Sequence, residues 1–120
     1  MVSSQKTVSR LRSGETPLGE VIDLLHDTSI VVRANALEAL IPHVQHDDRL
    51  LEQLKAAVVE PENQVRLVGT ISVAHVALGC LLRVGGGKAT EVAKSLIDTW
   101  PEPDRTDLLW YLRSEGLLNP

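Results

Sequence analysis

Apolar residues recur along this chain at intervals of three and four positions. The clearest series is Ile30, Ala34, Leu37, Ile41 and Val44, whose intervals are four, three, four and three. Side chains at these intervals share one face of an α-helix, whereas a half-buried strand alternates at every second residue. The segment is therefore predicted to be a helix that turns this face to the core.

The same period predicts further helices on both sides of this segment. The seven predicted helices are 3–13, 17–26, 30–44, about 48–58, about 62–84, about 89–99 and a last one that carries Leu108, Leu109 and Leu112. No stretch keeps an alternating pattern, so no strands are predicted.

Polar and special residues between the apolar series mark the expected helix ends. Thr16 is the expected N-cap of the second helix, with Pro17 at the first helical position. Asp47 or Asp48 is expected to cap the fourth helix, since aspartate accepts bonds from free backbone N–H groups there. Gly116 is the expected C-terminal cap of the last helix, with the leucine after it folded back.

The predicted helix at about 62–84 is apolar on nearly all sides. Such a helix is enclosed by neighbours, so it is expected at the centre of the fold. Small residues, such as Gly69 and Gly79, would let these neighbours approach closely. The run Gly85 to Gly87 is expected to end the helix in a flexible hairpin.

A stretch of seventeen residues occurs twice with a spacing of 33. The segment from Leu24 to Leu40 aligns without a gap on the segment from Ala57 to Val73. The aligned pairs include Asp27 with Glu60, Val32 with Val65, Arg33 with Arg66, Ala36 with Gly69 and Leu40 with Val73. A fixed period of this length indicates stacked helical repeats. We therefore expect one domain over residues 1–120, made of three antiparallel helix pairs and a terminal helix.

Composition and charge limit the classes of partner and location. The net charge is -4, from 12 Lys+Arg and 16 Asp+Glu, so the basic excess of a typical nucleic-acid surface is lacking. The longest uncharged run, Leu67 to Leu82, contains polar residues and is shorter than the roughly 20 residues of a membrane span. Cys80 is the single cysteine, and no signal peptide is seen, so we expect a cytoplasmic protein that binds neither nucleic acid nor membrane.

The segment DTSIVVRANALEAL, from Asp27 to Leu40, resembles the HEAT-like repeat of the phycobilisome-lyase type. The matching residues are Asp27, Val32, Arg33, Ala36, Ala39 and Leu40. The second copy keeps Pro61, Val65 and Arg66, whereas a third copy is absent at 98–99. The resemblance implies an all-α fold, a short right-handed α-solenoid of about three HEAT-like pairs with a C-terminal capping helix. It also implies that Arg33 and Arg66 pair with acids along the stack in a structural role.

The resemblance further implies that the second helix of each pair lines a concave face. The outward polar residues on this face would be Glu20, Asp23, Arg49, Glu52, Gln53, Glu91 and Lys94. Trp110 joins them as a candidate binding residue, because Trp110 and Tyr111 cannot both face inward and exposed aromatics anchor interfaces. The expected function is a non-catalytic adaptor or scaffold that binds another protein, as a monomer or weak dimer.

Three features resemble reactive sites only superficially, and no catalytic residue, metal or cofactor is predicted from them. The His-Asp pairs, such as His26-Asp27 and His46-Asp47, lie at helix ends, where capping explains them. The glycine run before Lys88 lacks the Walker spacing. His75 is expected to be a hydrogen-bonded core residue.

Other functions stay open from the sequence. A small inhibitor or immunity-type protein that blocks one enzyme would also suit an acidic face. A bilin lyase-like or metal-dependent enzyme and a self-assembling structural unit are further alternatives. A coloured or metal-loaded preparation would favour the enzyme.

Overall fold

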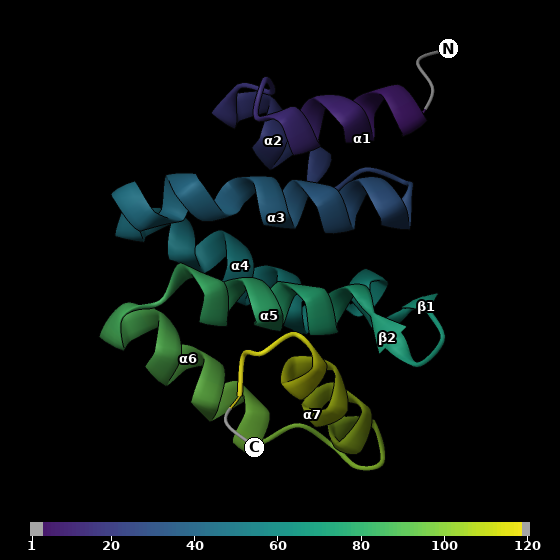
Figure 1. The fold of residues 1–120 in the computed structure, drawn as a ribbon, viewed down its shortest axis with the longest axis vertical. Helices are drawn as coiled ribbons and strands as arrows, with labels where there is room; N and C mark the ends of the chain where they lie inside the picture. Colours follow the sequence, from purple (N-terminus) through teal and green to yellow (C-terminus); the bar gives the residue numbers. More distant parts are fainter. Residues whose placement is uncertain (1–3, 119–120) are drawn as a thin grey trace.

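A computed structural model describes residues 4–118, and this part of the chain is mostly helical, as predicted (Figure 1). The α-helices are α1 Ser4–Ser13, α2 Leu18–Leu24, α3 Ile30–His46, α4 Leu51–Val59, α5 Val73–Val84, α6 Gly86–Asp98 and α7 Asp104–Ser114. A 3-10 turn, η1 Asp48–Leu50, precedes α4. A second one, η2 Pro61–Gln64, precedes a short hairpin of β1 Arg66–Val68 and β2 Ile71–Ser72. Within residues 4–118, no helix has the length and apolarity needed to cross a membrane.

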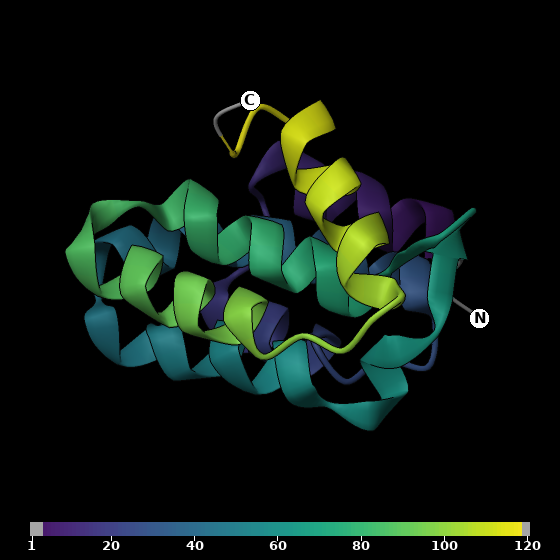
Figure 2. The ribbon, with the colours of Figure 1, turned by 90° about the horizontal axis from the view of Figure 1, so that it is seen from below.

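The helices form two layers. Helices α1, α3 and α5 lie one below the other along the long axis, with α7 beneath them (Figure 1). Helix α4 lies on the opposite side of α5 from α7, with α6 between α4 and α7 in the view from below (Figure 2). The closest packing joins α3 to α5, α4 to α5, and both α1 and α2 to α3. One continuous core therefore runs between the two layers.

Helix α5 is the central helix, as predicted. Every residue from Ile71 to Leu81 is buried, and α5 contacts α3, α4, α6 and α7. A Cβ atom added to Gly79 would lie 3.4 Å from both the Tyr111 and the Leu117 side chains. A side chain no larger than a methyl group therefore fits here at van der Waals contact, where α7 and the residues after it cover α5.

The predicted cap at the end of α7 is confirmed. Gly116 has a φ of 72°, the left-handed conformation that favours glycine. The Leu117 N–H donates to the Leu112 carbonyl at 2.8 Å, and Leu117 packs against the core. The chain thus folds back over α5 where the sequence indicates.

The predicted helix 62–84 is wrong over its first half, and so is the expectation of no strands. Residues 61–72 form η2 and the antiparallel hairpin, with Gly69 in its turn at a φ of 55°. The segment is rich in β-branched residues, which favour a pleated backbone. Helix α5 begins only after Ser72, whose side chain accepts from His75 N–H while His75 Nδ1 accepts from Ser72 N–H. This capping box sets the start of the helix.

Two predicted helix ends differ from the structure. Pro17, not Thr16, occupies the N-cap position of α2, and the buried Thr16 hydroxyl lacks a hydrogen-bond partner within residues 4–118. The glycine run is not a free hairpin, because Gly86 already starts α6 and only Gly85 separates it from α5. The Asp47 cap is confirmed, since its side chain accepts from the Arg49 N–H at the start of η1.

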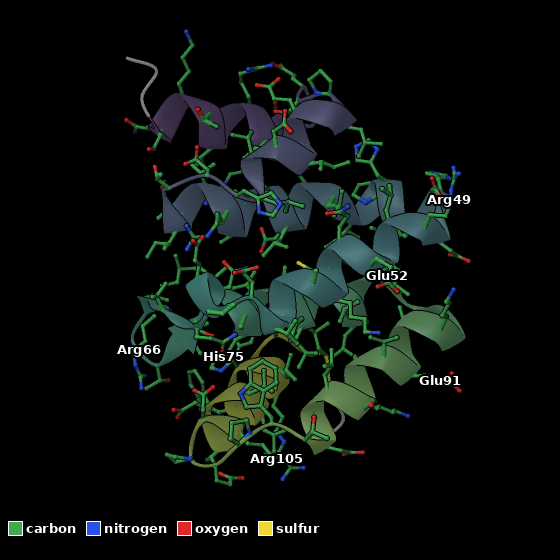
Figure 3. All side chains as sticks on the ribbon, turned by 180° about the vertical axis from the view of Figure 1, so that it is seen from behind. Arg49, Glu52, Arg66, His75, Glu91 and Arg105 are labelled. Carbon is green, nitrogen blue, oxygen red and sulfur yellow. The ribbon has the colours of Figure 1, made fainter. Side chains whose placement is uncertain are left out.

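The aligned arginines Arg33 and Arg66 occupy different environments. Arg33 lies in α3 and is 5% exposed, whereas Arg66 lies in β1 and is exposed (Figure 3). The Arg33 guanidinium donates to the Asp27, Thr28 and Glu62 carbonyls and to Asn63 Oδ1. Its partners within residues 4–118 are carbonyl oxygens rather than the acids that the resemblance implies. The 33-residue alignment therefore does not hold at this position of the structure.

Candidate functional site

The predicted binding residues on α2, η1, α4 and α6 lie on the elements that follow α1, α3 and α5 in the chain. Glu52 and Glu91 lie on the same side of the molecule, with Arg49 at its edge (Figure 3). The exposed members of the predicted set are Asp23, Arg49, Glu52, Glu91 and Lys94, while Glu20 and Gln53 are partly buried. The face made by α2, α4 and α6 is called the second-helix face below.

Two of these charged residues already have partners in the chain. Glu20 accepts from Arg10 of α1, with 3.1 Å between Oε1 and Nη1. Arg49 pairs with Asp47 at 3.0 Å, and this hydrogen bond is the main cause that lowers the pKa of Asp47 and raises the pKa of Arg49. Exposed pairs of this kind contribute little to stability. Glu52 and Glu91 are better placed to meet a partner, because they form no ion pair within the described residues.

A groove runs between α4 and α6 on the second-helix face. It consists of two hollows that share Leu96. The first has a volume of about 240 Å³ and is lined by Lys55, Glu91, Val92, Ser95 and Leu96. The second has a volume of about 210 Å³ and is lined by Val58, Val59, Gln64, Leu96, Thr99, Trp100, Pro101 and Asp104. Both are smaller than the roughly 300 Å³ at which small-molecule sites begin, so the groove suits the side chains of a macromolecule.

At the second hollow, Asp104 joins three elements of the fold. Its Oδ2 accepts from the Trp100 indole Nε1–H at 2.7 Å and lies 3.0 Å from His75 Nε2. The Trp100 and His75 rings are tilted against each other with centroids 5.6 Å apart. The first residue of α7 is thereby tied both to α5 and to the end of α6.

The surroundings of Asp104 keep its carboxyl group ionised. Partial burial favours the neutral form, but the hydrogen bonds from Trp100 and His75 and the charge of Arg66 outweigh it. The pKa of Asp104 is therefore lowered from its ordinary value. Its side chain is 38% exposed, so a charged oxygen atom is accessible from the groove.

His75 is a hydrogen-bonded core histidine, as predicted. The side chain is fully buried. Nδ1 accepts from the Ser72 N–H, so Nε2 carries the proton that is donated to Asp104. Both ring nitrogens are occupied, which leaves no atom free to take a proton from a substrate.

Trp110 and Cys80 lie away from the groove. Trp110 is 63% exposed, in agreement with the prediction that Trp110 or Tyr111 faces solvent. It belongs to α7, which packs on α5 and β2, so the structure does not bring it to the groove between α4 and α6. Cys80 is buried, and burial is the main cause that raises the pKa of its thiol far above the ordinary value. Such a thiol is unreactive.

The histidines and acids of the predicted His-Asp pairs do not converge. Within residues 4–118, no three His, Cys, Asp or Glu side chains are grouped so that they could hold a metal ion. Comparison of the chain with protein-family models, with curated proteins and with solved structures finds no match.

Sequence reasoning misses the part of the groove built from Trp100 and Asp104. Trp100 packs against the core, but it is only partly buried and also lines the hollow. Asp104 follows a proline at the start of a helix, where an acid has an ordinary capping explanation. The only signal in the sequence is that Asp104 follows Trp100 by four residues. Nothing in the sequence links Asp104 to His75.

Proposed function

We propose that the protein is a non-catalytic interaction module that binds another protein on its second-helix face. The observation that carries this proposal is the groove between α4 and α6, whose lining combines apolar side chains with the charged residues Lys55, Glu91 and Asp104. Interfaces commonly combine an apolar centre with a polar rim. Rigid helices on both sides hold these groups in place, so little ordering is needed on binding.

We further propose that the helices form a short right-handed solenoid of HEAT-like pairs, with α7 as the capping helix. Support comes from the succession of α1, α3 and α5 along one layer. Arg33 adds to it, because its guanidinium joins the turn before α3 to the turn after α4. In such a solenoid the second helices line one continuous surface, which is the surface proposed here to bind.

Charge reversal at Glu91, which lines the first hollow, and at Glu52, which is exposed on α4 of the same face, tests the docking face. A partner would be captured from the native lysate, identified and purified, and its affinity measured by calorimetry. We expect Glu52→Lys and Glu91→Lys each to weaken binding by about tenfold, which corresponds to ~1.4 kcal/mol. Both residues are exposed, so the melting temperature should stay nearly unchanged.

Glu38→Lys is the matched control. Glu38 is also exposed, but it lies on α3 beside α1, where it lines a different hollow with Arg12 and Pro42. The same charge change there should leave the affinity unaltered. Unchanged binding in both second-helix variants, or an equal loss in the control, would remove the second-helix face as the docking site.

A further inference from the structure

We propose that the second hollow of the groove receives a lysine or arginine side chain of the partner. This inference rests on the proposed function and adds the chemistry of the partner to it. The hollow lies between the end of α4 and the turn from α6 to α7.

The lining of the hollow fits a side chain with an apolar stem and a positive head. Val58, Val59, Leu96 and Pro101 supply apolar walls, and Asp104 is the one charged residue among the described residues that line the hollow. Lysine and arginine bury an aliphatic stem while the charged head reaches a polar group. An acidic side chain would meet the Asp104 carboxylate, and an apolar one would displace water from Oδ1 without replacing its hydrogen bond.

Asp104 is held in position before any partner arrives. Trp100 and His75 both bond to Oδ2, so Oδ1 is the oxygen left to accept from a partner. A carboxylate fixed by two donors loses little freedom when a third group binds. Hydrogen bonds to an ionised acceptor are stronger than neutral ones, which favours an ammonium or guanidinium donor.

The charged neighbours of the hollow in the chain include both signs. The exposed acids Glu60 and Asp98 follow and precede the lining residues Val59 and Thr99, whereas the Arg105 guanidinium, next to Asp104, donates to the Ile97 carbonyl and lies 3.9 Å from Glu102. Arg66 is the cation whose charge acts on Asp104, but the two form no ion pair or hydrogen bond within the described residues. Arg66 therefore reduces the negative potential without occupying the hollow, whose lining does not include it.

The position of the hollow also constrains the partner segment. Glu91 in the first hollow and Thr99 in the second lie eight residues apart along α6, which spans about 12 Å at 1.5 Å per residue. A helical partner would cover this span with about two turns of apolar residues. The basic residue would stand at the end of this apolar segment, over Asp104.

A display library of random 16-residue peptides, selected on the full chain, tests this chemistry. We expect the selected peptides to carry lysine or arginine beside apolar residues. Replacing that basic residue by norleucine should weaken binding about tenfold, because norleucine keeps the stem and removes the charge. Asp104→Asn should cause the same loss, while Asp107→Asn, one turn further along α7, should cause none.

A second variant is needed because Asp104→Asn also alters the hydrogen bonds to Trp100 and His75 within the fold. Val59 is 63% exposed, so Val59→Lys leaves the core intact and places an ammonium group beside the hollow. It should compete for Asp104 and weaken the selected peptides, whereas Val59→Gln, of similar length but uncharged, should not.

The outcomes separate this inference from the proposed function. The inference would be overturned if the selected peptides show no preference for a basic residue or bind equally well with norleucine. It would also be overturned if their affinity is unchanged by both Asp104→Asn and Val59→Lys, or if the library yields no binder. If such peptides still lose affinity with Glu91→Lys, the docking face survives. If they ignore every change on the second-helix face, the proposed function fails too.

Discussion

Replacement of Arg33 by alanine tests how the turns between helices are held together. The guanidinium is almost fully buried and makes four hydrogen bonds, of 2.8 to 3.4 Å, to the segments before α3 and after α4. Alanine keeps the helix but removes every donor. Asp27, Thr28 and Glu62 carbonyls and the Asn63 amide oxygen then lose their shared partner.

The expected cost follows from these contacts. Removal of the guanidinium leaves four oxygen acceptors without this donor, and each buried acceptor that stays unsatisfied costs about 1–3 kcal/mol. A cavity of about 40 Å³ beside Arg33 offers room for water to reach some of these acceptors. The loss should therefore be ~3 kcal/mol, the cost of one or two acceptors that stay unsatisfied. For a domain of this size that corresponds to a fall in melting temperature of roughly 10–20 °C.

Urea unfolding followed by circular dichroism would measure the change in the free energy of unfolding. Arg66→Ala is the matched control, since Arg66 aligns with Arg33 in the repeat but lies exposed on β1. Its free energy of unfolding should change by less than about 0.5 kcal/mol. Similar effects of the two substitutions, or a loss below about 1 kcal/mol for Arg33→Ala, would refute this explanation of the inter-helix turns.

Two further predictions concern the acid and glycine positions. The pKa of Asp104 is lowered in the folded protein, so its stabilising contribution is present above the unfolded value of about 3.9 and is lost as the pH falls through the folded pKa. The difference in melting temperature between the wild type and Asp104→Asn should thus stay constant near neutral pH and shrink below about pH 4. A difference that grows below pH 4 would contradict the lowered pKa of Asp104. Alanine should have opposite effects at two glycines. Gly79→Ala should raise the free energy of unfolding by up to about 1 kcal/mol through helix propensity, since its Cβ meets neighbours only at 3.4 Å. Gly116→Ala should destabilise by about 1 kcal/mol because φ is 72°, and equal shifts in urea midpoint would contradict both assignments.

The sequence predicts the elements whose apolar residues keep one period over three or more turns. Helix α3 is of this kind, because its apolar spacing suffices to define it. The end of α7 is predictable for another reason, because Gly116 marks the cap. The start of α5 is different. Leu67 and Ile71 keep the helical interval of four, but half of residues 65–72 are β-branched. The capping box that ends the hairpin also uses His75, where glutamate or glutamine is usual. A helix-period search therefore extends the helix through the hairpin.

The candidate site is predictable only in part, because its two hollows have different origins. The first depends on residues that each helix presents by its own period, such as Glu91 on α6. The second depends on a contact between Asp104 and His75, which are 29 residues apart in the chain. Local propensity carries no information about such a contact, so the most charged part of the groove emerges only from the fold.

Hydrogen exchange of the full chain, free and bound to a captured partner, tests the docking face most directly. If the partner lies in the groove between α4 and α6, amide exchange should slow in α4 and in α6 from Glu91 onward, with α1 and the exposed side of α3 unchanged. Slower exchange confined to α1, to α7 around Trp110 or to the hairpin would place the partner elsewhere and contradict the proposed function.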